Sequence, residues 1–267
     1  MKQTTERLFP GRTKTVEERV IDAKHRFAYA LVEEYASSTD RLLEVGFGEG
    51  YGAEIVAPWV AEYVGIEVDR ESVTHAEEKY GRASVSFVYY DGLSLPFDDG
   101  SFDLVIAFQV LEHVPDPEAF LRGARRVARP GAPVLIVTPN RNYRVRDGER
   151  PWNRYHVREF NPEELETEVR KVFDVVDIYG IHGSPAMNEI EKNRVARARK
   201  LARMDRLGLR YRLPEGFDAR LRSFLGRRRT ASPASDDVEL GIGVEHVRHT
   251  REGVDASLDL LAVVRAS

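Results

Sequence analysis

Four side chains near the middle of the chain have the types and spacing of a divalent-metal site. Gln109, Glu112 and His113 stand at positions i, i+3 and i+4, so a helical turn here would put all three on one face. His156 follows in a long loop predicted over residues 140–158, and it could reach the same place from the other side. Carboxylate, amide and imidazole ligands with open positions suit Mg²⁺ or Mn²⁺, with zinc or iron as softer alternatives.

A simpler interpretation of these residues needs no metal. Glu112 would favour a helix N-terminus, and His113 could line a pocket as an ordinary base. Gln109 is neutral, which makes the ligand set weaker by one charge than a set with an acid at this position. Both interpretations stay open on the sequence.

A glycine-rich turn leads the series of elements that must position these side chains. Residues 41–45 form a short apolar strand, and Gly46, Gly48 and Gly50 follow it, which permits tight bending and close approach of the backbone to a ligand. A second apolar run ends in Glu67, about 20 residues further on, where doubly wound nucleotide-binding folds hold a ribose. Asp69 competes with Glu67 for that role.

Glu44, at the end of the first strand, argues against a dinucleotide in this turn. Its negative charge would face a pyrophosphate, which is unfavourable. The same carboxylate could accept hydrogen bonds from a cationic amino-acid ligand.

Apolar runs and helical stripes alternate along most of the chain. Strands are predicted over residues 41–45, 63–67, 85–90, 102–108, 133–140, 173–179 and 257–265. Helices are predicted over residues 16–35, 52–60, 71–80 and 117–127. This alternation predicts an α/β, doubly wound, mostly parallel sheet of seven strands, with ligands at the carboxyl ends of the strands.

Four strand-end motifs together resemble those of the class I S-adenosylmethionine (SAM) methyltransferases. They are E-x-G-x-G-x-G from Glu44, G-x-E ending at Glu67, D-G at Asp91, and F-D-L-V followed by L-E-H-V, within roughly residues 24–180. The resemblance implies a Rossmann-like fold with an antiparallel last strand and SAM as the cofactor.

The resemblance also implies a set of cofactor contacts near the carboxyl ends of the first four strands. The set is His25, Glu44, Gly46, Gly48, Gly50, Glu67, Asp91, Gly92, Leu93 and Phe108. Within it, Glu67 would bind the ribose hydroxyls and Asp91 the adenine amine. Glu67 and Asp91 could instead only cap the segments that follow them, and His25 could be a solvated or capping residue.

A closer resemblance covers almost the whole chain. The motifs G-E-G-Y-G-A, F-Q-V-L-E-H, T-P-N-R, R-Y-H-V-R-E-F and S-L-D-L-L-A look like those of actinobacterial sugar O-methyltransferases of methylated-polysaccharide synthesis. This implies methyl transfer to a hydroxyl of a small sugar or glycoside with a divalent metal. The metal ligands would be Gln109, Glu112, His113 and His156, and His113, ahead of His156, would be the catalytic base.

Three other functions stay open beside this one. A metal-free methyltransferase acting on a quinol or lipid-like molecule would use His113 as its base. The run E-H with a downstream histidine also resembles the small-RNA 2′-O-methyltransferases. A basic module that binds RNA or a membrane surface and keeps SAM as a structural ligand is the third.

Composition excludes several classes of site. The 267 residues are 42% hydrophobic and include no cysteine, so disulfides, thiolate ligands and cysteine catalysis are absent. The sequence has neither an apolar run of about 18 residues nor an apolar signal core near residue 1, which predicts a soluble cytoplasmic protein without a transmembrane segment.

Charge is distributed unevenly along the chain. Residues 184–230 contain 14 Lys and Arg against five Asp and Glu, a net charge of +9 in a chain of −4. We therefore predict an N-terminal arm over residues 1–15, a methyltransferase domain over 16–183, a helical basic insertion over 184–235, and a final strand region over 236–267. The insertion would be a lid, an acceptor-binding element or a homodimer element, and a nucleic-acid contact is less favoured.

Overall fold

The computed structural model describes residues 15–145, 149–204 and 241–265. Nearly all of the predicted N-terminal arm lies outside this range. So does the predicted insertion beyond Met204. The proposed division of the chain into an arm, a domain and an insertion therefore stays a prediction.

The described residues form one sheet in the order β3-β2-β1-β4-β5-β8-β6-β7. The strands are β1 (Arg41–Val45), β2 (Glu62–Glu67), β3 (Val85–Tyr89), β4 (Leu104–Phe108), β5 (Pro133–Pro139), β6 (Val175–His182), β7 (Arg248–Thr250) and β8 (Asp259–Arg265). The first five pair in parallel, and β8 inserts antiparallel between β5 and β6. The Rossmann-like sheet and its antiparallel last strand are confirmed.

The predicted strand number of seven is wrong by one. The extra strand, β7, pairs with β6 over three residues. Its sequence Arg248-His249-Thr250 lacks an apolar run, so hydrophobic periodicity could not detect it. It lies at the sheet edge, and only the tertiary pairing makes it a strand.

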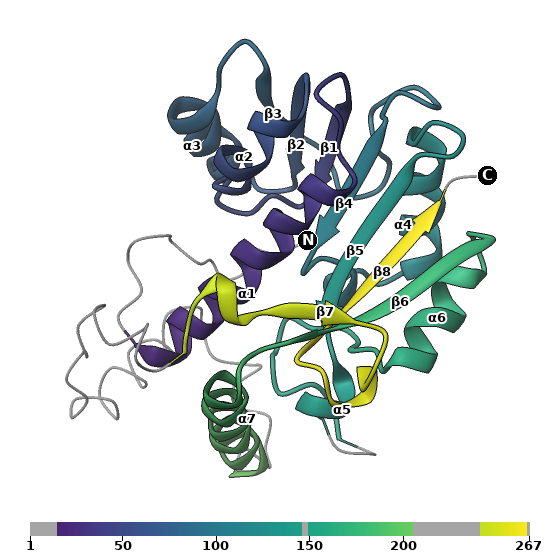
Figure 1. The fold of residues 1–267 in the computed structure, drawn as a ribbon. Coiled ribbons are helices and arrows are strands. Elements are labelled where there is room, and N and C mark those ends of the chain that lie inside the picture. The colour runs from purple at the N-terminus through teal and green to yellow at the C-terminus, as the bar shows by residue number, and fades with distance from the viewer. Residues whose placement is uncertain (1–14, 146–148, 205–240, 266–267) are drawn as a thin grey trace.

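Helices cover both faces of the sheet (Figure 1). The α-helices are α1 (Val16–Ala30), α2 (Gly52–Val56), α3 (Arg70–Tyr80), α4 (Pro117–Val127), α5 (Arg141–Arg144), α6 (Pro162–Arg170) and α7 (Pro185–Met204). Short 3-10 helices are η1 (Leu31–Glu34), η2 (Ala57–Trp59), η3 (Leu111–His113), η4 (Val244–His246) and η5 (Val254–Ala256). Residues of α1, α2, α3 and α7 pack in one core cluster, and residues of α4 and α6 in the other.

Alternation along the strands separates the two core clusters. In β1, Leu42 belongs to the cluster with α1, and Leu43 and Val45 belong to the cluster with α4. All three side chains are fully buried. Successive side chains of a strand point to opposite faces, so one apolar run serves both layers.

Local sequence signals define where α1 and α4 begin. Thr15 and Glu18 form a capping box at the start of α1. Asp116 caps α4, and Pro117 occupies its first turn.

Among the helices that the structure describes, none has both the length and the apolar character needed to cross a membrane.

Candidate active site

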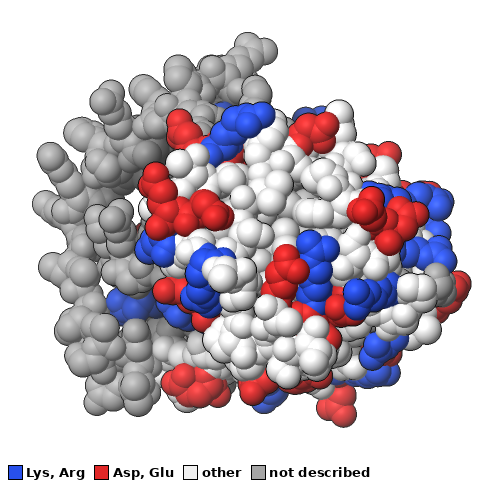
Figure 2. Space-filling model, turned by 90° about the horizontal axis from the view of Figure 1, so that it is seen from above, with Lys and Arg blue, Asp and Glu red and all other residues white. Residues whose placement is uncertain are grey.

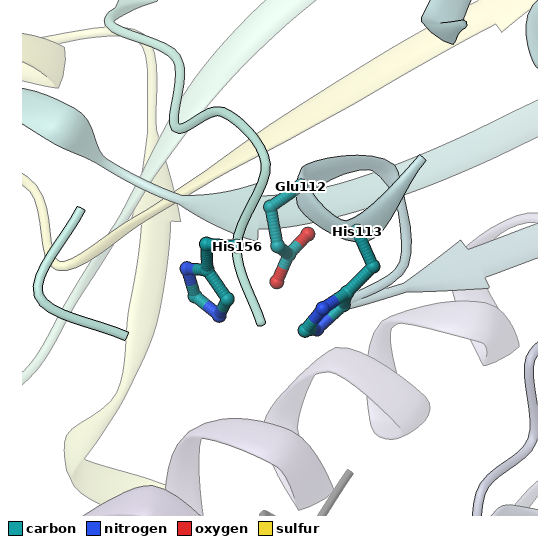
Figure 3. A group of neighbouring side chains, drawn as sticks. All are labelled: Glu112, His113 and His156. Atoms are coloured by element: carbon teal, nitrogen blue, oxygen red, sulfur yellow. The ribbon is translucent and has the colours of Figure 1, made fainter. Parts of the chain in front are cut away.

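Three of the predicted metal ligands converge at the carboxyl edge of the sheet. Glu112 and His113 lie on η3, directly after β4, and His156 lies in the loop that follows α5. One ligand atom from each residue lies within 4.8 Å of the others. Figure 3 shows the carboxylate between the two imidazoles, with all three side chains directed toward one another.

Hydrogen bonds on the far side of each imidazole determine its tautomer. His156 Nδ1 lies 2.6 Å from Glu159 Oε1, and His113 Nδ1 lies 3.0 Å from the carbonyl oxygen of Tyr155. A carbonyl and a carboxylate oxygen can only accept, so each Nδ1 carries the proton and donates it. The Nε2 lone pair of each neutral ring is then the one available to a metal or a proton.

The backbone of the loop is tied directly to η3. The N–H groups of Val157 and Arg158 donate to the carbonyl oxygen of Glu112, at 2.8 and 3.3 Å. These bonds fix the loop beside Glu112. His156 is therefore held near His113 although 43 positions separate them in the sequence.

Glu112 is the most enclosed of the three residues, with 1% of its surface exposed. Its Oε2 accepts a hydrogen bond of 2.9 Å from the Thr138 hydroxyl, and its buried Oε1 has no hydrogen-bond partner among the described residues. Burial raises the pKa of Glu112, and the Thr138 hydrogen bond opposes that rise. A divalent cation would pair with the second oxygen and balance its charge, so the residues present fit a metal ion.

The structure contradicts the helical turn that was assumed for one of the predicted ligands. Gln109 lies before η3 with a φ of 57°, the left-handed region, and is the one non-glycine residue with positive φ in the described part of the chain. A left-handed residue cannot belong to the same right-handed turn as Glu112 and His113. The predicted helical face is therefore wrong at Gln109, and its role as a ligand stays a prediction.

The glycine turn after β1 has the backbone geometry of a ligand cradle. Gly46, Gly48 and Gly50 have φ values of 79°, 60° and 77°. A Cβ on Gly46 would lie 2.6 Å from Val110, and one on Gly50 would lie 2.7 Å from Ala76. A Cβ on Gly48 would meet nothing within 4 Å, so this glycine borders open space that a ligand could fill.

Glu67, at the end of β2, is tied to the glycine turn. Its carboxylate accepts hydrogen bonds from the N–H groups of Gly48, at 3.1 Å, and Val68, at 2.7 Å. Asp69 instead caps α3, because its Oδ2 accepts from the backbone N–H of Ser72 at 3.1 Å. Of the two acids, Glu67 has the position that suits a ribose at the turn.

Glu44 lies in the core with 1% of its surface exposed. Both of its carboxylate oxygens accept from tyrosines, Oε1 from the Tyr29 hydroxyl at 2.7 Å and Oε2 from the Tyr63 hydroxyl. Burial raises its pKa to about 7, although both hydrogen bonds act to lower it. Its predicted contact with the methionine part of SAM stays a prediction, with both oxygens already engaged.

At the predicted adenine site, Asp91 caps the segment that follows it. Asp91 Oδ1 accepts from the backbone N–H groups of Leu93, at 2.8 Å, and Ser94, at 3.3 Å, and these bonds lower the pKa of the exposed Asp91 carboxyl. Gly92 has a φ of 80°, and the Leu93 side chain is 88% exposed. An adenine contact at these residues stays a prediction.

His25 and Phe108 both lie beside tyrosines near the glycine turn. The Tyr51 hydroxyl, one residue after Gly50, is 3.3 Å from His25 Nδ1. The Phe108 ring contacts the Tyr29 ring edge to face at 5.4 Å between centroids. Both placements are compatible with the predicted cofactor contacts.

Comparisons with known proteins agree with this arrangement. A family model described as a methyltransferase domain matches residues 43–136. A probable SAM-dependent methyltransferase of Mycolicibacterium smegmatis is 34% identical over 190 residues, which cover 70% of this chain and 71% of that protein. The chain belongs to the SAM-dependent methyltransferases. SAM is therefore the methyl donor, and the enzyme catalyses a reaction of class EC 2.1.1.

Other relatives of this methyltransferase share a smaller part of their length or only the fold. A probable SAM-dependent methyltransferase of Mycobacterium tuberculosis is 34% identical over 142 residues, which cover 53% of this chain and 51% of that protein. The crystal structure of a SAM-dependent methyltransferase from Thermotoga maritima, titled a possible histamine N-methyltransferase, superposes with a TM-score of 0.56 at 15% identity. That match covers 94% of each chain.

Sequence reasoning missed three residues that the methyltransferase uses to hold this edge of the sheet. Tyr29 and Tyr63 enclose Glu44, and Glu159 holds His156. A weak signal existed for Glu159, because it stands three residues after His156 in R-Y-H-V-R-E-F. No local signal pairs Tyr29 or Tyr63 with Glu44, because the contacts join α1 to β1 and β1 to β2.

Proposed function

We propose that this methyltransferase transfers the SAM methyl group to a hydroxyl of a small acceptor, most favourably a sugar or glycoside, with the assistance of Mg²⁺ or Mn²⁺. The observation that supports the metal is the convergence of Glu112, His113 and His156 within 4.8 Å. The buried Glu112 Oε1 without a hydrogen-bond partner among the described residues supports it independently.

The chemistry requires an acceptor oxygen that can lose its proton. The hydroxyl oxygen forms a bond to the methyl carbon as the sulfonium C–S bond breaks, and the hydroxyl proton must leave in the same process. A neutral sugar hydroxyl is a poor nucleophile at neutral pH. When bound, the divalent cation would bind the hydroxyl and lower its pKa.

Residues of the chain would hold the cation, remove the proton and position SAM. Glu112 supplies the negative charge that holds the cation, and Thr138 orients its carboxylate through the 2.9 Å hydrogen bond. An imidazole Nε2 that is not a ligand could take the hydroxyl proton, and His113 is the preferred base because it is partly exposed whereas His156 is buried. The glycine turn and Glu67 would position SAM so that donor and acceptor meet in line.

A methyl-transfer screen tests this function. The full chain would be supplied with SAM and with glycosides, quinols, lipids or short RNAs, with and without EDTA. We expect transfer to a glycoside that EDTA stops and Mg²⁺ or Mn²⁺ restores. Full activity of EDTA-treated enzyme would leave a metal-free pocket with His113 as base.

Charge on the face of the molecule in Figure 2 gives little support to an RNA acceptor. On the face shown in Figure 2, acidic and basic side chains are interspersed rather than gathered by sign. A nucleic-acid partner is therefore less favoured in this proposal, and a homodimer stays open.

A further inference from the structure

Beyond the candidate ligands themselves, a buried carboxylate holds the second histidine. Glu159 is 3% exposed, and its Oε1 lies 2.6 Å from His156 Nδ1. This contact leaves the Nε2 side of the ring directed toward Glu112, as Figure 3 shows. A carboxylate behind an imidazole fixes the orientation of the ring and makes it a better ligand.

Glu159 has its own cationic neighbour. Arg144, on α5, is 7% exposed, and its Nε lies 3.2 Å from the same Oε1, at ion-pair distance but without hydrogen-bond geometry. A buried carboxylate needs such a counter-charge to be tolerated. Arg144 therefore stabilises the acceptor that holds His156.

Arg144 is also held by Trp152 and by α7, which is the first part of the predicted insertion. The Arg144 guanidinium lies over the Trp152 ring at 4.7 Å from the centroid, and Arg194 of α7 lies over the same ring at 5.2 Å. Arg199, also on α7, donates from Nε to the carbonyl oxygen of Arg144 at 2.8 Å. Stacked and hydrogen-bonded arginines restrict one another, so this part of the loop is braced against α7.

We propose that Glu159, paired with Arg144, is the positioning residue of the metal centre. It holds His156 in the Nδ1–H tautomer with Nε2 toward Glu112, and α7 supports the pair through Trp152. The inference rests on the proposed metal-assisted function, and it assigns to the first part of the insertion a role in shaping the acceptor site.

Mn²⁺ titration of the full chain by calorimetry tests the assignment, with SAM titration as a second readout. Glu159→Gln keeps the shape of the side chain and removes its charge, so we expect Mn²⁺ to bind about 10- to 100-fold more weakly, the usual range for outer-shell partners. SAM affinity should be unchanged, because the contacts that the proposal assigns to Glu159 are with His156 and Arg144. Glu163→Gln, the same change on an exposed carboxylate of α6, should leave both affinities as in the wild type.

A second variant keeps the test decisive if Glu159→Gln does not fold. If Glu159→Gln leaves Arg144 without its counter-charge and unfolds the protein, the double variant Arg144→Met/Glu159→Gln removes both charges and should show the same loss of Mn²⁺ affinity. Wild-type Mn²⁺ affinity in either folded variant would overturn the positioning role alone. A wild type that binds no Mn²⁺ would overturn the metal-assisted function, and the positioning role with it.

Discussion

We call the proposed cofactor site around Glu44 and Glu67 the cofactor end, and the proposed acceptor site around Glu112 and His113 the acceptor end. The two ends differ in how far apart in the sequence their contacting residues stand. At the cofactor end, Glu44 meets Tyr29 over 15 positions and Tyr63 over 19. Glu67 meets Gly48 over 19 positions and also the adjacent Val68. At the acceptor end, Glu112 meets Thr138 over 26 positions and His113 meets Tyr155 over 42. The hydrogen bonds of Glu44 and Glu67 therefore join neighbouring segments of the chain, whereas those of Glu112 and His113 reach more distant segments.

The two ends also balance buried charge differently. Glu44 is enclosed by neutral tyrosines, and burial raises its pKa to about 7. Burial also acts to raise the pKa of Glu191 on α7, but Lys24 and Arg194 outweigh it and lower that pKa to about 2. Arginines accompany Glu191 and Glu159, so these two carboxylates depend on the completeness of their ion pairs.

The largest expected effect separates the two ends by activity. Glu112→Ala and His156→Ala should each reduce turnover more than about 100-fold, beyond the range typical of outer-shell residues, while SAM affinity stays near the wild-type value. The reason is that, in the proposed function, both residues act on the acceptor and not on the cofactor. Turnover assays and SAM calorimetry on the same preparations measure the two properties.

Matched controls use side chains of the same type on the surface. Glu163→Ala removes an exposed carboxylate of α6, and His75→Ala removes an exposed imidazole of α3. Both should keep turnover. Loss of SAM binding in the Glu112 or His156 variants would mean that the two ends are not separable.

The next effect belongs to the cofactor end. Glu67→Ala should weaken SAM binding roughly tenfold or more, since loss of a charged hydrogen-bonding partner typically costs about 1.5–3 kcal/mol. Calorimetry at constant pH measures it, and Glu78→Ala, an exposed residue of α3, is the control. Unchanged affinity in Glu67→Ala would move the ribose contact to Asp69.

This contrast of range explains what the sequence could predict. The strands β1 to β5, the glycine turn and the place of Glu67 at a strand end follow from local periodicity and spacing. The pairing of Glu112 with His156 was predicted from their common edge of a parallel sheet, which is a topological argument. The predicted helical face was wrong at Gln109, because local spacing assumed a helix whereas the chain turns through a left-handed residue there. Glu159 and Arg144 depend on α5 and α7, whose mutual placement no local pattern specifies.

A smaller effect concerns the pH dependence of stability at the cofactor end. The pKa of Glu44 is raised to about 7 in the folded protein, so the folded state binds more protons than the unfolded state between roughly pH 4.5 and 7. The stability from this group is present below that window and is lost as pH rises through it. Glu44→Gln removes the titration, so the wild type should lose on the order of 1–3 kcal/mol relative to the variant between pH 4 and 8.

Urea unfolding of both proteins at several pH values measures this difference. Parallel profiles would show that Glu44 does not titrate in this range and that the tyrosines hold it ionised. Glu191 provides the contrast, because its lowered pKa should remove stability only as pH falls below the usual range of a carboxyl.

The smallest expected effect distinguishes two roles of α7: support of the loop around Arg144, or binding of a polyanion. Three arginines of α7 already have partners within the chain: Arg194 pairs with Glu191, Arg197 with Glu17, and Arg199 with the Arg144 carbonyl. A polyanion would have to displace these contacts, so we expect the full chain to show no binding to short RNA or anionic vesicles at low salt. Binding that weakens steeply as salt rises would instead indicate release of counterions from neutralised phosphates. That result would make the basic insertion an acceptor-recruiting surface and would overturn its role as a support for the acceptor end.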